Sequence, residues 1–317
     1  MSTIQKRKIT VVGAGYVGST CAHLCAMKDL ASEIVLIDVL EGRPQGIALD
    51  LNQSGAVEGF GATVIGTNDP KDTHGSDLVI VTAGIPRKPG MSRSDLLATN
   101  AKIILSVADY VRVGSPDAHV IVVTNPLDSM VHLFRSRSGF PGARVTGMAG
   151  VLDSARFSWF IAEATRTGVQ DVQAMVLGAH GDSMVPLPAY CVVNGVGVRD
   201  LVDPTKLAEM EKRTRNGGAE IVNLLKTGSA WYAPASSSVA MAKSILNDEK
   251  RLLPCACFLN GQYGFEGLYM GVPAVLGRNG VEKIVEVPLD LEARAQMQKT
   301  AGAILQDVQL MRDMKLL

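Results

Sequence analysis

The fold of this 317-residue chain is constrained most by its first apolar run, Lys8–Gly15 (KITVVGAG). The β-branched residues of this run predict a buried strand, and the helix formers of Tyr16–Met27 follow it directly. Between them, Gly13–Gly18 fits the pattern G-x-G-x-x-G, and Asp38 lies twenty residues beyond Gly18, at the end of the next apolar run. A glycine turn that follows a strand and opens a helix, with an acid at this distance, predicts a dinucleotide-binding fold.

Apolar runs alternate with helical patterns over the first 150 residues. After the first strand, the predicted strands are Glu33–Asp38, Ala62–Thr67, Asp77–Ala83, His119–Thr124 and Arg144–Gly147. The predicted helices are Tyr16–Met27, Arg43–Val57, Ser94–Val113 and Leu127–Arg137. Near-continuous apolar strands that alternate with helices indicate a parallel sheet covered on both faces, and right-handed crossovers make it doubly wound. We therefore predict an α/β protein with a Rossmann doubly wound parallel sheet in residues 1–150, which binds ligands at the carboxyl ends of its strands.

After Gly150 the pattern becomes a mixture of helices and short strands. Helices are predicted for Leu152–Thr167, Pro204–Leu225, Ser236–Asn247 and a last stretch from Asp290. Strands are predicted for Val172–Gly178, within Met184–Val198, and for Cys255–Leu259, Ala274–Gly277 and Val281–Val287. No linker precedes this part, so we expect residues 151–317 to form a catalytic α+β domain that packs tightly on the first domain.

Charge and cysteine content exclude several classes of function. The formal net charge is zero, so no overall positive charge attracts nucleic acid or an anionic membrane. No stretch reaches the roughly 18 consecutive apolar residues that span a bilayer, and the first residues lack the apolar core of a secretory signal. The five cysteines match neither a zinc site nor a redox pair. We expect all five to be reduced core residues of a cytoplasmic protein without a metal site.

Each glycine of the turn has a predicted role. Gly13 makes the tight turn, Gly15 lets the backbone approach a pyrophosphate, and Gly18 lets the helix pack close to the sheet, with the helix N-terminus facing the phosphates. Asp38 can accept a hydrogen bond from a ribose hydroxyl and would repel a 2′-phosphate, which favours NAD over NADP. The alternative interpretation is a glycine turn without a ligand.

A second candidate site is the segment Gly84–Leu96 (GIPRKPGMSRSDL), which follows the predicted strand Asp77–Ala83. Arg87 and Arg93 are six positions apart on this segment of prolines and glycines. Two positive charges on a loop at the end of a strand suit a small anion, although a solvated surface loop is the alternative. The turn Thr124–Pro126 is predicted at the same edge of the sheet.

Asp153, Arg156 and His180 form a candidate catalytic set. Asp153 and Arg156 are three residues apart at the start of a predicted helix and project from one face of it. His180 follows a predicted strand; a histidine there is most often structural, but a carboxylate and arginines would give it partners. This set permits hydride transfer between a nicotinamide and a 2-oxo or 2-hydroxy acid, with His180 exchanging the hydroxyl proton and Asp153 stabilising the imidazolium.

The arginines and Asn125 have predicted roles towards such a substrate. Arg156 would bind the carboxylate beside the reacting carbon in a bidentate fork. Arg93 would polarise the carbonyl oxygen, and Asn125 would hold the same oxygen or the nicotinamide side.

Five motifs, VGAGYVG, AGIPRKPGMSR, VTNPLD, VLDSARF and GAHGD, resemble in order and spacing those of the lactate/malate dehydrogenase family. Within the family, the chain is similar to the NAD-dependent malate dehydrogenases of the lactate dehydrogenase-like group. The resemblance implies reversible oxidation of (S)-malate to oxaloacetate, a reaction of the tricarboxylic acid cycle, with His180 and Asp153 as catalytic residues. It implies substrate contacts at Arg87, Arg93, Asn125 and Arg156. It implies NAD contacts at Gly13, Ala14, Gly15, Tyr16, Val17, Gly18, Asp38, Asn100, Val123, Thr124 and Asn125.

Within this resemblance, Arg87 is the position that separates substrates. Lactate dehydrogenases of the family typically have glutamine there, facing a methyl group, whereas an arginine pairs with a second carboxylate. With pyruvate the arginine would lack its partner, at a cost of about 3–5 kcal/mol, which is a preference of roughly 10²- to 10³-fold. Ser229 and Ala230 stand where lactate enzymes usually carry a bulkier Tyr-Thr pair, which leaves room for the longer diacid.

Three alternatives stay open from the sequence. The first is a lactate or other 2-hydroxy-acid dehydrogenase. The second is an NAD-dependent glycosidase, which needs metal ligands for which the sequence offers no plausible set. The third is a non-catalytic NAD-binding protein, against which His180, Asp153 and Arg156 argue. The Ala/Gly/Cys-rich helix after Gly18 and the helix after Arg43 could bury a subunit face, so we expect a homodimer or homotetramer.

Overall fold

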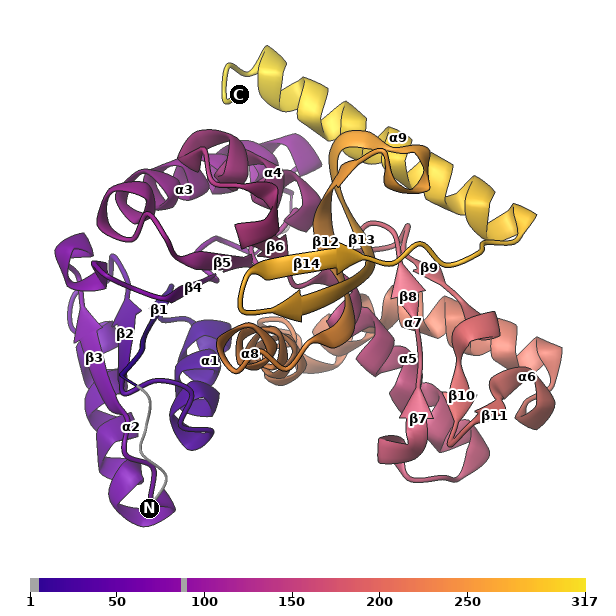
Figure 1. Ribbon diagram of the computed structural model, residues 1–317, viewed down its shortest axis with the longest axis horizontal. Coiled ribbons are helices and arrows are strands. Elements are labelled where there is room, and N and C mark those ends of the chain that lie inside the picture. Colours follow the sequence, from indigo (N-terminus) through magenta and orange to yellow (C-terminus); the bar gives the residue numbers. More distant parts are fainter. Residues whose placement is uncertain (1–5, 87–89) are drawn as a thin grey trace.

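The computed structural model of the protein describes residues 6–86 and 90–317. Its centre is a nine-stranded sheet with the order β14-β13-β12-β6-β5-β4-β1-β2-β3 (Figure 1). Six of these strands run parallel: β1 (Lys8–Val12), β2 (Glu33–Ile37), β3 (Thr63–Thr67), β4 (Leu78–Val81), β5 (His119–Val122) and β6 (Val145–Gly147). Their order, β3-β2-β1-β4-β5-β6, is that of the doubly wound dinucleotide-binding fold. The predicted fold class is confirmed.

Helices cover both faces of this sheet. They are α1 (Tyr16–Met27), α2 (Arg43–Glu58), α3 (Arg93–Gly114), α4 (Leu127–Ser138) and α8 (Tyr232–Leu246). Helices α3 and α4 lie against each other on one face, whereas α1 and α8 pack side by side on the other (Figure 1). Because α8 comes from the second half of the chain, that half covers part of the nucleotide-binding sheet.

The sheet continues without a break into the second half. Strands β12 (Arg251–Asn260), β13 (Glu266–Gly277) and β14 (Gly280–Ile284) are antiparallel neighbours, and β12 joins β6 through the pair Ala256–Gly147. β12 and β13 are longer than the predicted strands, although each contains a proline. Pro254 lies directly opposite Pro273, so neither residue has to donate an N–H to the other.

The rest of the second half forms a smaller lobe beside the sheet. Its helices are α5 (Ala149–Thr165), α6 (Val198–Leu201) and α7 (Pro204–Leu225), and α9 (Leu291–Asp313) crosses the outside of the molecule. Its strands are β7 (Val172–Gln173), β8 (Val176–Leu177), β9 (Val185–Pro186), β10 (Val192–Val193) and β11 (Val196–Gly197). Short 3₁₀ turns lie at Pro70–Thr73, Gly142–Arg144, Val169–Asp171, Pro188–Tyr190 and Gln262–Gly264.

One predicted strand of this lobe is wrong. The sequence pattern predicted a single strand over Val172–Gly178, but the chain forms β7 and β8 there, and they belong to different sheets. β7 pairs with β10, whereas β8 pairs with β9. The chain changes sheets between them, which an apolar run alone does not reveal.

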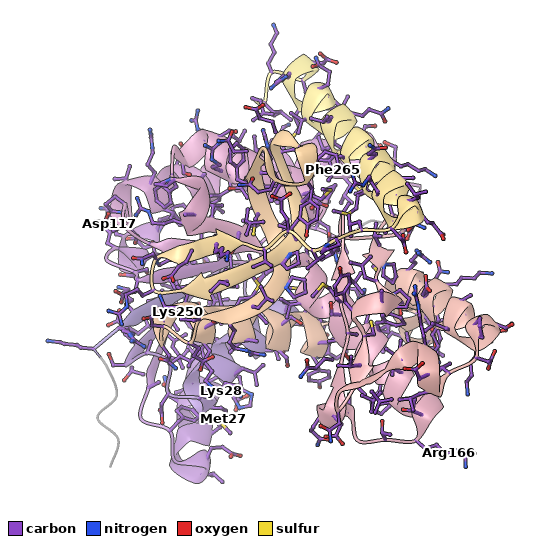
Figure 2. All side chains as sticks on the ribbon, turned by 45° about the vertical axis from the view of Figure 1, so that its right-hand side comes forward. Met27, Lys28, Asp117, Arg166, Lys250 and Phe265 are labelled. Carbon is purple, nitrogen blue, oxygen red and sulfur yellow. The ribbon has the colours of Figure 1, made fainter. Side chains whose placement is uncertain are left out.

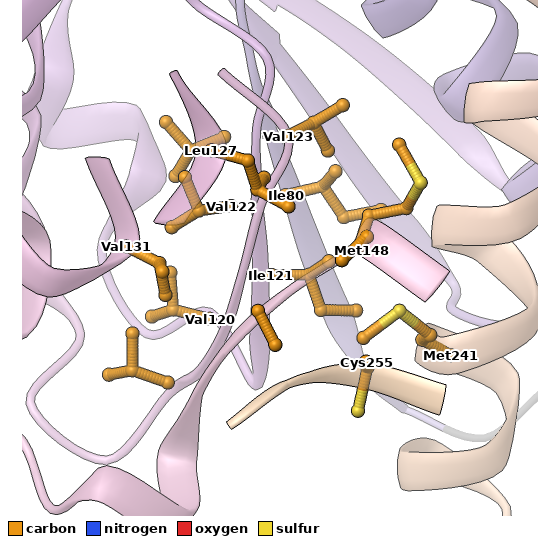
Figure 3. Packing of buried hydrophobic residues seen from close by; sticks show 14 of the residues in the cluster. Ile80, Val120, Ile121, Val122, Val123, Leu127, Val131, Met148, Met241 and Cys255 are labelled. Carbon is orange, nitrogen blue, oxygen red and sulfur yellow. The ribbon is translucent and has the colours of Figure 1, made fainter. Parts of the chain in front are cut away.

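The apolar core spans both halves of the chain. Figure 3 shows Ile80 of β4 and Ile121 of β5 beside Met241 of α8 and Cys255 of β12. All five cysteines are free and buried, as predicted. Polar side chains project from both lobes, with Asp117 on one side and Arg166 at the end of α5 on the other (Figure 2). In the described ranges, no helix combines the length and the apolar character needed to cross a membrane.

Candidate active site

The glycine turn between β1 and α1 has the geometry that a dinucleotide needs. Gly13 has a φ of +101°, and a Cβ there would lie 2.8 Å from the Ala83 nitrogen. A Cβ on Gly18 would lie 1.7 Å from the Gly13 oxygen, so α1 could not pack this closely with any other residue. A Cβ on Gly15 would meet nothing within 4 Å. The backbone at Gly15 is therefore open to a ligand at the N-terminus of α1, and these residues fit NAD.

Asp38 lies beside this turn, at the end of β2. Its Oδ2 accepts a hydrogen bond from the Ala14 nitrogen at 2.6 Å, and its Oδ1 accepts one from the Leu40 nitrogen at 3.0 Å. Arg43 was not predicted as a site residue, yet its Nε donates to the Ala14 oxygen at 2.7 Å. The Ala14 peptide is thus held from both sides, which fixes the turn before any cofactor binds.

The ends of β4 and β5 meet next to the turn, and Asn100 of α3 connects them. Asn100 is buried, and its Nδ2 donates to the Asn125 oxygen at 2.7 Å and to the Ile85 oxygen at 3.1 Å. Its Oδ1 accepts from the Ile85 nitrogen at 2.9 Å. The three hydrogen bonds that Asn100 makes with described residues therefore go to backbone, and its direct contact with NAD stays a prediction.

The predicted residues at the end of β5 differ in exposure. Val123 and Thr124 are buried, and the Thr124 Oγ1 donates to the Ala83 oxygen at 2.7 Å. Asn125 is exposed, and a cis peptide bond joins it to Pro126. The Asn125 side chain is therefore accessible at the carboxyl edge of the sheet, where ligands of this fold bind.

His180, Asp153 and Arg156 come together as the sequence predicted. The His180 Nδ1 lies 2.9 Å from Asp153 Oδ2, and the Arg156 Nη1 donates to Asp153 Oδ1 at 3.3 Å. Asp153 and Arg156 project from the first turns of α5, while His180 follows β8 in a loop between Gly178 and Gly181. Both glycines have positive φ, +84° and +133°, which lets this loop turn the imidazole towards α5.

The electrostatics of this set suit proton exchange at His180. Burial lowers the pKa of His180, but the charge of Asp153 and its hydrogen bond outweigh it, so the pKa lies above the ordinary histidine value. Burial lowers the pKa of Arg156, and the charge of Asp153 opposes this. Because the Asp153 carboxylate can only accept a hydrogen bond, the His180 Nδ1 that contacts it carries the proton, and the His180 Nε2 is left to face a substrate.

Arg156 has its space because α7 carries two glycines where it passes the site. A Cβ on Gly217 would lie 3.1 Å from the Arg156 Cδ, and one on Gly218 would lie 3.7 Å from its Nη2. Glycine in a helix interior is destabilising relative to alanine, so the pair indicates a packing requirement. The helix backbone approaches the arginine here.

Two residues near the site escaped the sequence analysis. Asp128, in the first turn of α4, accepts a hydrogen bond from the His180 backbone nitrogen at 3.1 Å. Trp231, just before α8, stacks on Tyr16 of the glycine turn with ring centroids 5.0 Å apart. Asp128 follows Asn125 by three residues, and its position at a helix N-terminus was a usable signal. The stack joins segments that are 215 residues apart in the chain, and no local sequence pattern predicts it.

The remaining residues that were predicted around the substrate are Arg87, Arg93, Ser229 and Ala230. Arg87 lies outside the described residues. Arg93 is the first residue of α3, and a capping box between Ser92 and Asp95 closes the N-terminus of this helix. Ser229 is exposed and Ala230 half-buried, between α7 and α8. Among the residues of 6–86 and 90–317, no group of three His, Cys, Asp or Glu side chains could hold a metal ion.

The fold and the geometry of this set define an oxidoreductase with a dinucleotide-binding domain and a His–Asp pair beside a half-buried arginine. Residues 7–147 match the family model described as "lactate/malate dehydrogenase, NAD binding domain". Residues 150–314 match the family model described as "lactate/malate dehydrogenase, alpha/beta C-terminal domain". The chain belongs to the lactate/malate dehydrogenase family, as its motifs predicted, and NAD is its cofactor.

Its relatives include both branches of the family. The malate dehydrogenase of Roseiflexus castenholzii is 50% identical over 307 residues, which cover 97% of this chain and 99% of the relative. The malate dehydrogenase structure from Salinibacter ruber superimposes with a TM-score of 0.93 at 47% identity, covering 97% of this chain and 99% of the other. A lactate dehydrogenase of Cryptosporidium parvum, solved with lactic acid and NAD, gives a TM-score of 0.94 at 42% identity, covering 98% and 99%. The fold alone therefore does not select the substrate.

Proposed function

We propose that the chain catalyses the reversible, NAD-dependent oxidation of (S)-malate to oxaloacetate. The observation that carries the proposal is the His180–Asp153 hydrogen bond of 2.9 Å with Arg156 on the other oxygen of the same carboxylate. The malate dehydrogenases named above, from Roseiflexus castenholzii and Salinibacter ruber, support the predicted activity. The roles of individual residues are our proposals.

His180 acts as the proton acceptor in malate oxidation and as the proton donor in oxaloacetate reduction. Its Nε2 takes the proton from the substrate hydroxyl, and the Asp153 carboxylate at Nδ1 stabilises the imidazolium that results. The raised pKa of His180 favours this protonated form. NAD, when bound, would supply the acceptor for the hydride from the carbon that bears this hydroxyl.

The positive groups bind and polarise the substrate. Arg156 pairs with the carboxylate next to the reacting carbon, since its half-buried guanidinium keeps N–H groups beyond the one that contacts Asp153. Arg93 and Asn125 hold the reacting oxygen, where negative charge develops in reduction. Arg87 pairs with the second carboxylate and so selects the diacid.

The residues at the carboxyl ends of the parallel strands would hold the cofactor. The turn Gly13–Gly18, with Ala14, Tyr16 and Val17, would bind its pyrophosphate, and Asp38 would bind the adenosine ribose. Val123, Thr124 and Asn125 line the nicotinamide side, and Asn100 supports them through its hydrogen bond to the Asn125 oxygen.

A paired assay tests this function. Oxaloacetate and pyruvate are compared as oxidants of NADH, and NADPH replaces NADH in a parallel series. We expect kcat/KM to favour oxaloacetate and NADH; a preference for pyruvate would instead identify a lactate dehydrogenase.

The variant Arg87→Gln tests the selecting residue. It should lower kcat/KM for oxaloacetate by roughly 10²- to 10³-fold, because the second carboxylate loses its charged partner, while the KM for NADH stays near its original value. Arg112→Gln, an exposed arginine on α3, is the matched control and should change neither constant. If Arg87→Gln weakened the use of oxaloacetate and of NADH equally, the loop would have a role other than selecting the substrate.

We also propose the wider organisation of the protein. The chain divides near residue 150 into a NAD-binding domain and a catalytic domain, and it works as a cytoplasmic homodimer or homotetramer. Helix α2 supports an intersubunit face, because only Pro44 and Ala48 of it are buried while Leu49 and Val57 are exposed. Light scattering on the purified protein distinguishes monomer, dimer and tetramer.

A further inference from the structure

Asp128 lies where the two halves of the active site meet. It is in the first turn of α4, three residues after Asn125, and α4 packs against α3, α9 and β13. Its Oδ2 accepts the hydrogen bond from the His180 nitrogen at 3.1 Å, across 52 residues of chain. This bond joins the end of β5, where the substrate oxygen is held, to the loop that carries the catalytic imidazole.

The His180 loop is held by hydrogen bonds from several elements. β8 ends at Leu177, and the loop that follows bends at Gly178 and Gly181, both with positive φ. Gly178 pairs with Gly271 of β13 through two backbone hydrogen bonds of 2.9 Å. Beyond that bridge, Asp128 holds the backbone of His180, and Asp153 holds its ring. His180 is therefore fixed at two points, its backbone by one carboxyl group and its ring by another.

Within the described part of the chain, Asp128 Oδ1 is buried and makes no hydrogen bond. A buried carboxylate oxygen without a donor is costly, whereas the protonated form is neutral. Burial raises the pKa of Asp128 to about 7; the His180 N–H bond and the charge of His180 lower it, and the charge of Asp153 raises it.

Among the described residues, His180 and Asp153 are the charged neighbours that act on Asp128 from the catalytic lobe. On α9, Asp307 accepts a hydrogen bond from Ser129, the residue next to Asp128. Because Asp128 is one of the charges that raise the pKa of His180, gain of a proton by Asp128 makes the imidazole a weaker base.

We propose that Asp128 is a positioning residue of the reaction: its carboxyl anchors the His180 backbone to the substrate-oxygen turn, and its charge state adjusts the proton affinity of the imidazole. This proposal rests on the proposed function of His180. It predicts that Asp128 and His180 titrate as a coupled pair, so the pH profile of the enzyme reflects both groups.

Two substitutions separate the hydrogen bond from the charge. Asp128→Asn keeps an oxygen that can accept from the His180 nitrogen but carries no charge. We expect the acidic limb of kcat/KM for malate oxidation to move about half to one pH unit lower, because a neighbouring negative charge is removed. Asp128→Leu loses the anchor as well, and we expect kcat to fall by roughly 10- to 100-fold, as a displaced catalytic group would cause, with the KM for NADH little changed.

Ser129→Ala is the matched control. It changes the adjacent buried residue of α4 and its bond to Asp307 without touching His180, so its pH profile should equal that of the unmodified protein. If Asp128→Asn shows the unmodified pH profile, the proposed effect of charge is overturned. If Asp128→Leu keeps its kcat, the proposed anchor is overturned.

A spectroscopic titration keeps the test open if Asp128→Leu does not fold. The protein has five histidines, and comparison with His180→Asn assigns the His180 resonance in isotope-labelled protein. The ring pKa of His180 should be lower in Asp128→Asn than in the unmodified protein; an unchanged pKa contradicts the proposal. Unmodified protein that oxidises no malate would refute the proposed function instead, and the two failures are thus distinguishable.

Discussion

Gly15 and Gly18 are three residues apart in one turn, yet a methyl group added to each would meet different surroundings. At Gly18 the added Cβ would overlap the Gly13 oxygen, whereas at Gly15 it would point into open space. Gly18 is therefore required by the packing of the protein itself. Gly15 is not, and we propose that the bound cofactor requires it.

This difference gives a test at the scale of single residues. Gly15→Ala should leave the melting temperature near its original value but raise the KM for NADH at least ten-fold, equivalent to about 1.4 kcal/mol, because the methyl group occupies the space of the pyrophosphate. Gly18→Ala should destabilise the fold by more than about 3 kcal/mol, since backbone has to move. Calorimetry and NADH titration measure both; a Gly15→Ala protein with normal NADH binding would contradict the assignment of this turn.

Helix α7 shows how a single element serves the site from outside it. Gly217 and Gly218 are adjacent in its interior, but only a Cβ on Gly217 would lie within 3.1 Å of Arg156. Gly218→Ala would bring ordinary contact at 3.7 Å. The two glycines are thus a matched pair, alike in helix position and different in their distance from Arg156.

We expect the two alanine variants of α7 to diverge. Gly218→Ala should stabilise the protein by about 0.5–1 kcal/mol, because alanine favours a helix interior, and leave the KM for oxaloacetate unchanged. Gly217→Ala should displace Arg156 by a few tenths of an ångström and raise that KM on the order of ten-fold. Steady-state kinetics and urea unfolding decide the matter, and equal KM values for the two variants would remove the proposed role of the Gly217 contact.

Individual elements also show what the sequence could predict. α1 and α7 begin and end where their patterns predict. α1 begins directly after the glycine turn, and Asp203 caps α7 before Pro204. α8 begins at Tyr232, four residues before the predicted start, because Pro234 is tolerated in a first helical turn. The length of β12 and β13 depends on pairing between distant segments, which no local pattern contains.

The candidate site divides in the same way. His180, Asp153 and Arg156 were predictable because each follows a local motif, and the topology then brings strand ends to one edge. Asp128 and Trp231 were missed because their contacts, with His180 and Tyr16, are made only by the folded chain.

At the scale of the whole molecule, His132 of α4 links pH to stability. It is buried against Tyr269, and burial, with the charges of Arg135 and Arg312, lowers its pKa to about 4. The unfolded chain takes up a proton at this histidine near pH 6.5, before the folded protein does. Stability therefore is unaffected above that pH, falls between about pH 6.5 and 4, and loses nothing further to this group below it.

The non-titrating variant His132→Gln tests this dependence. The pKa shift of His132 corresponds to about 3 kcal/mol of stability between the two ends of this pH range. The urea midpoint of the variant should therefore fall less with decreasing pH than that of the unmodified protein. His23→Gln, on α1, is the control for the loss of a histidine elsewhere. An equally steep decline in His132→Gln and the unmodified protein would assign the acid sensitivity to other groups.

The continuous sheet has a consequence for synthesis of the chain. β6 is complete at Gly147, but its partner Ala256 in β12 is about 110 residues further along. At 5–20 residues per second, a ribosome needs on the order of 5 to 20 s to deliver it. During that interval the newly made nucleotide-binding half has an open edge at β6, a strand that is later internal. Chaperones that shield strand edges therefore have a defined window of action on this protein, which closes when β12 pairs with β6.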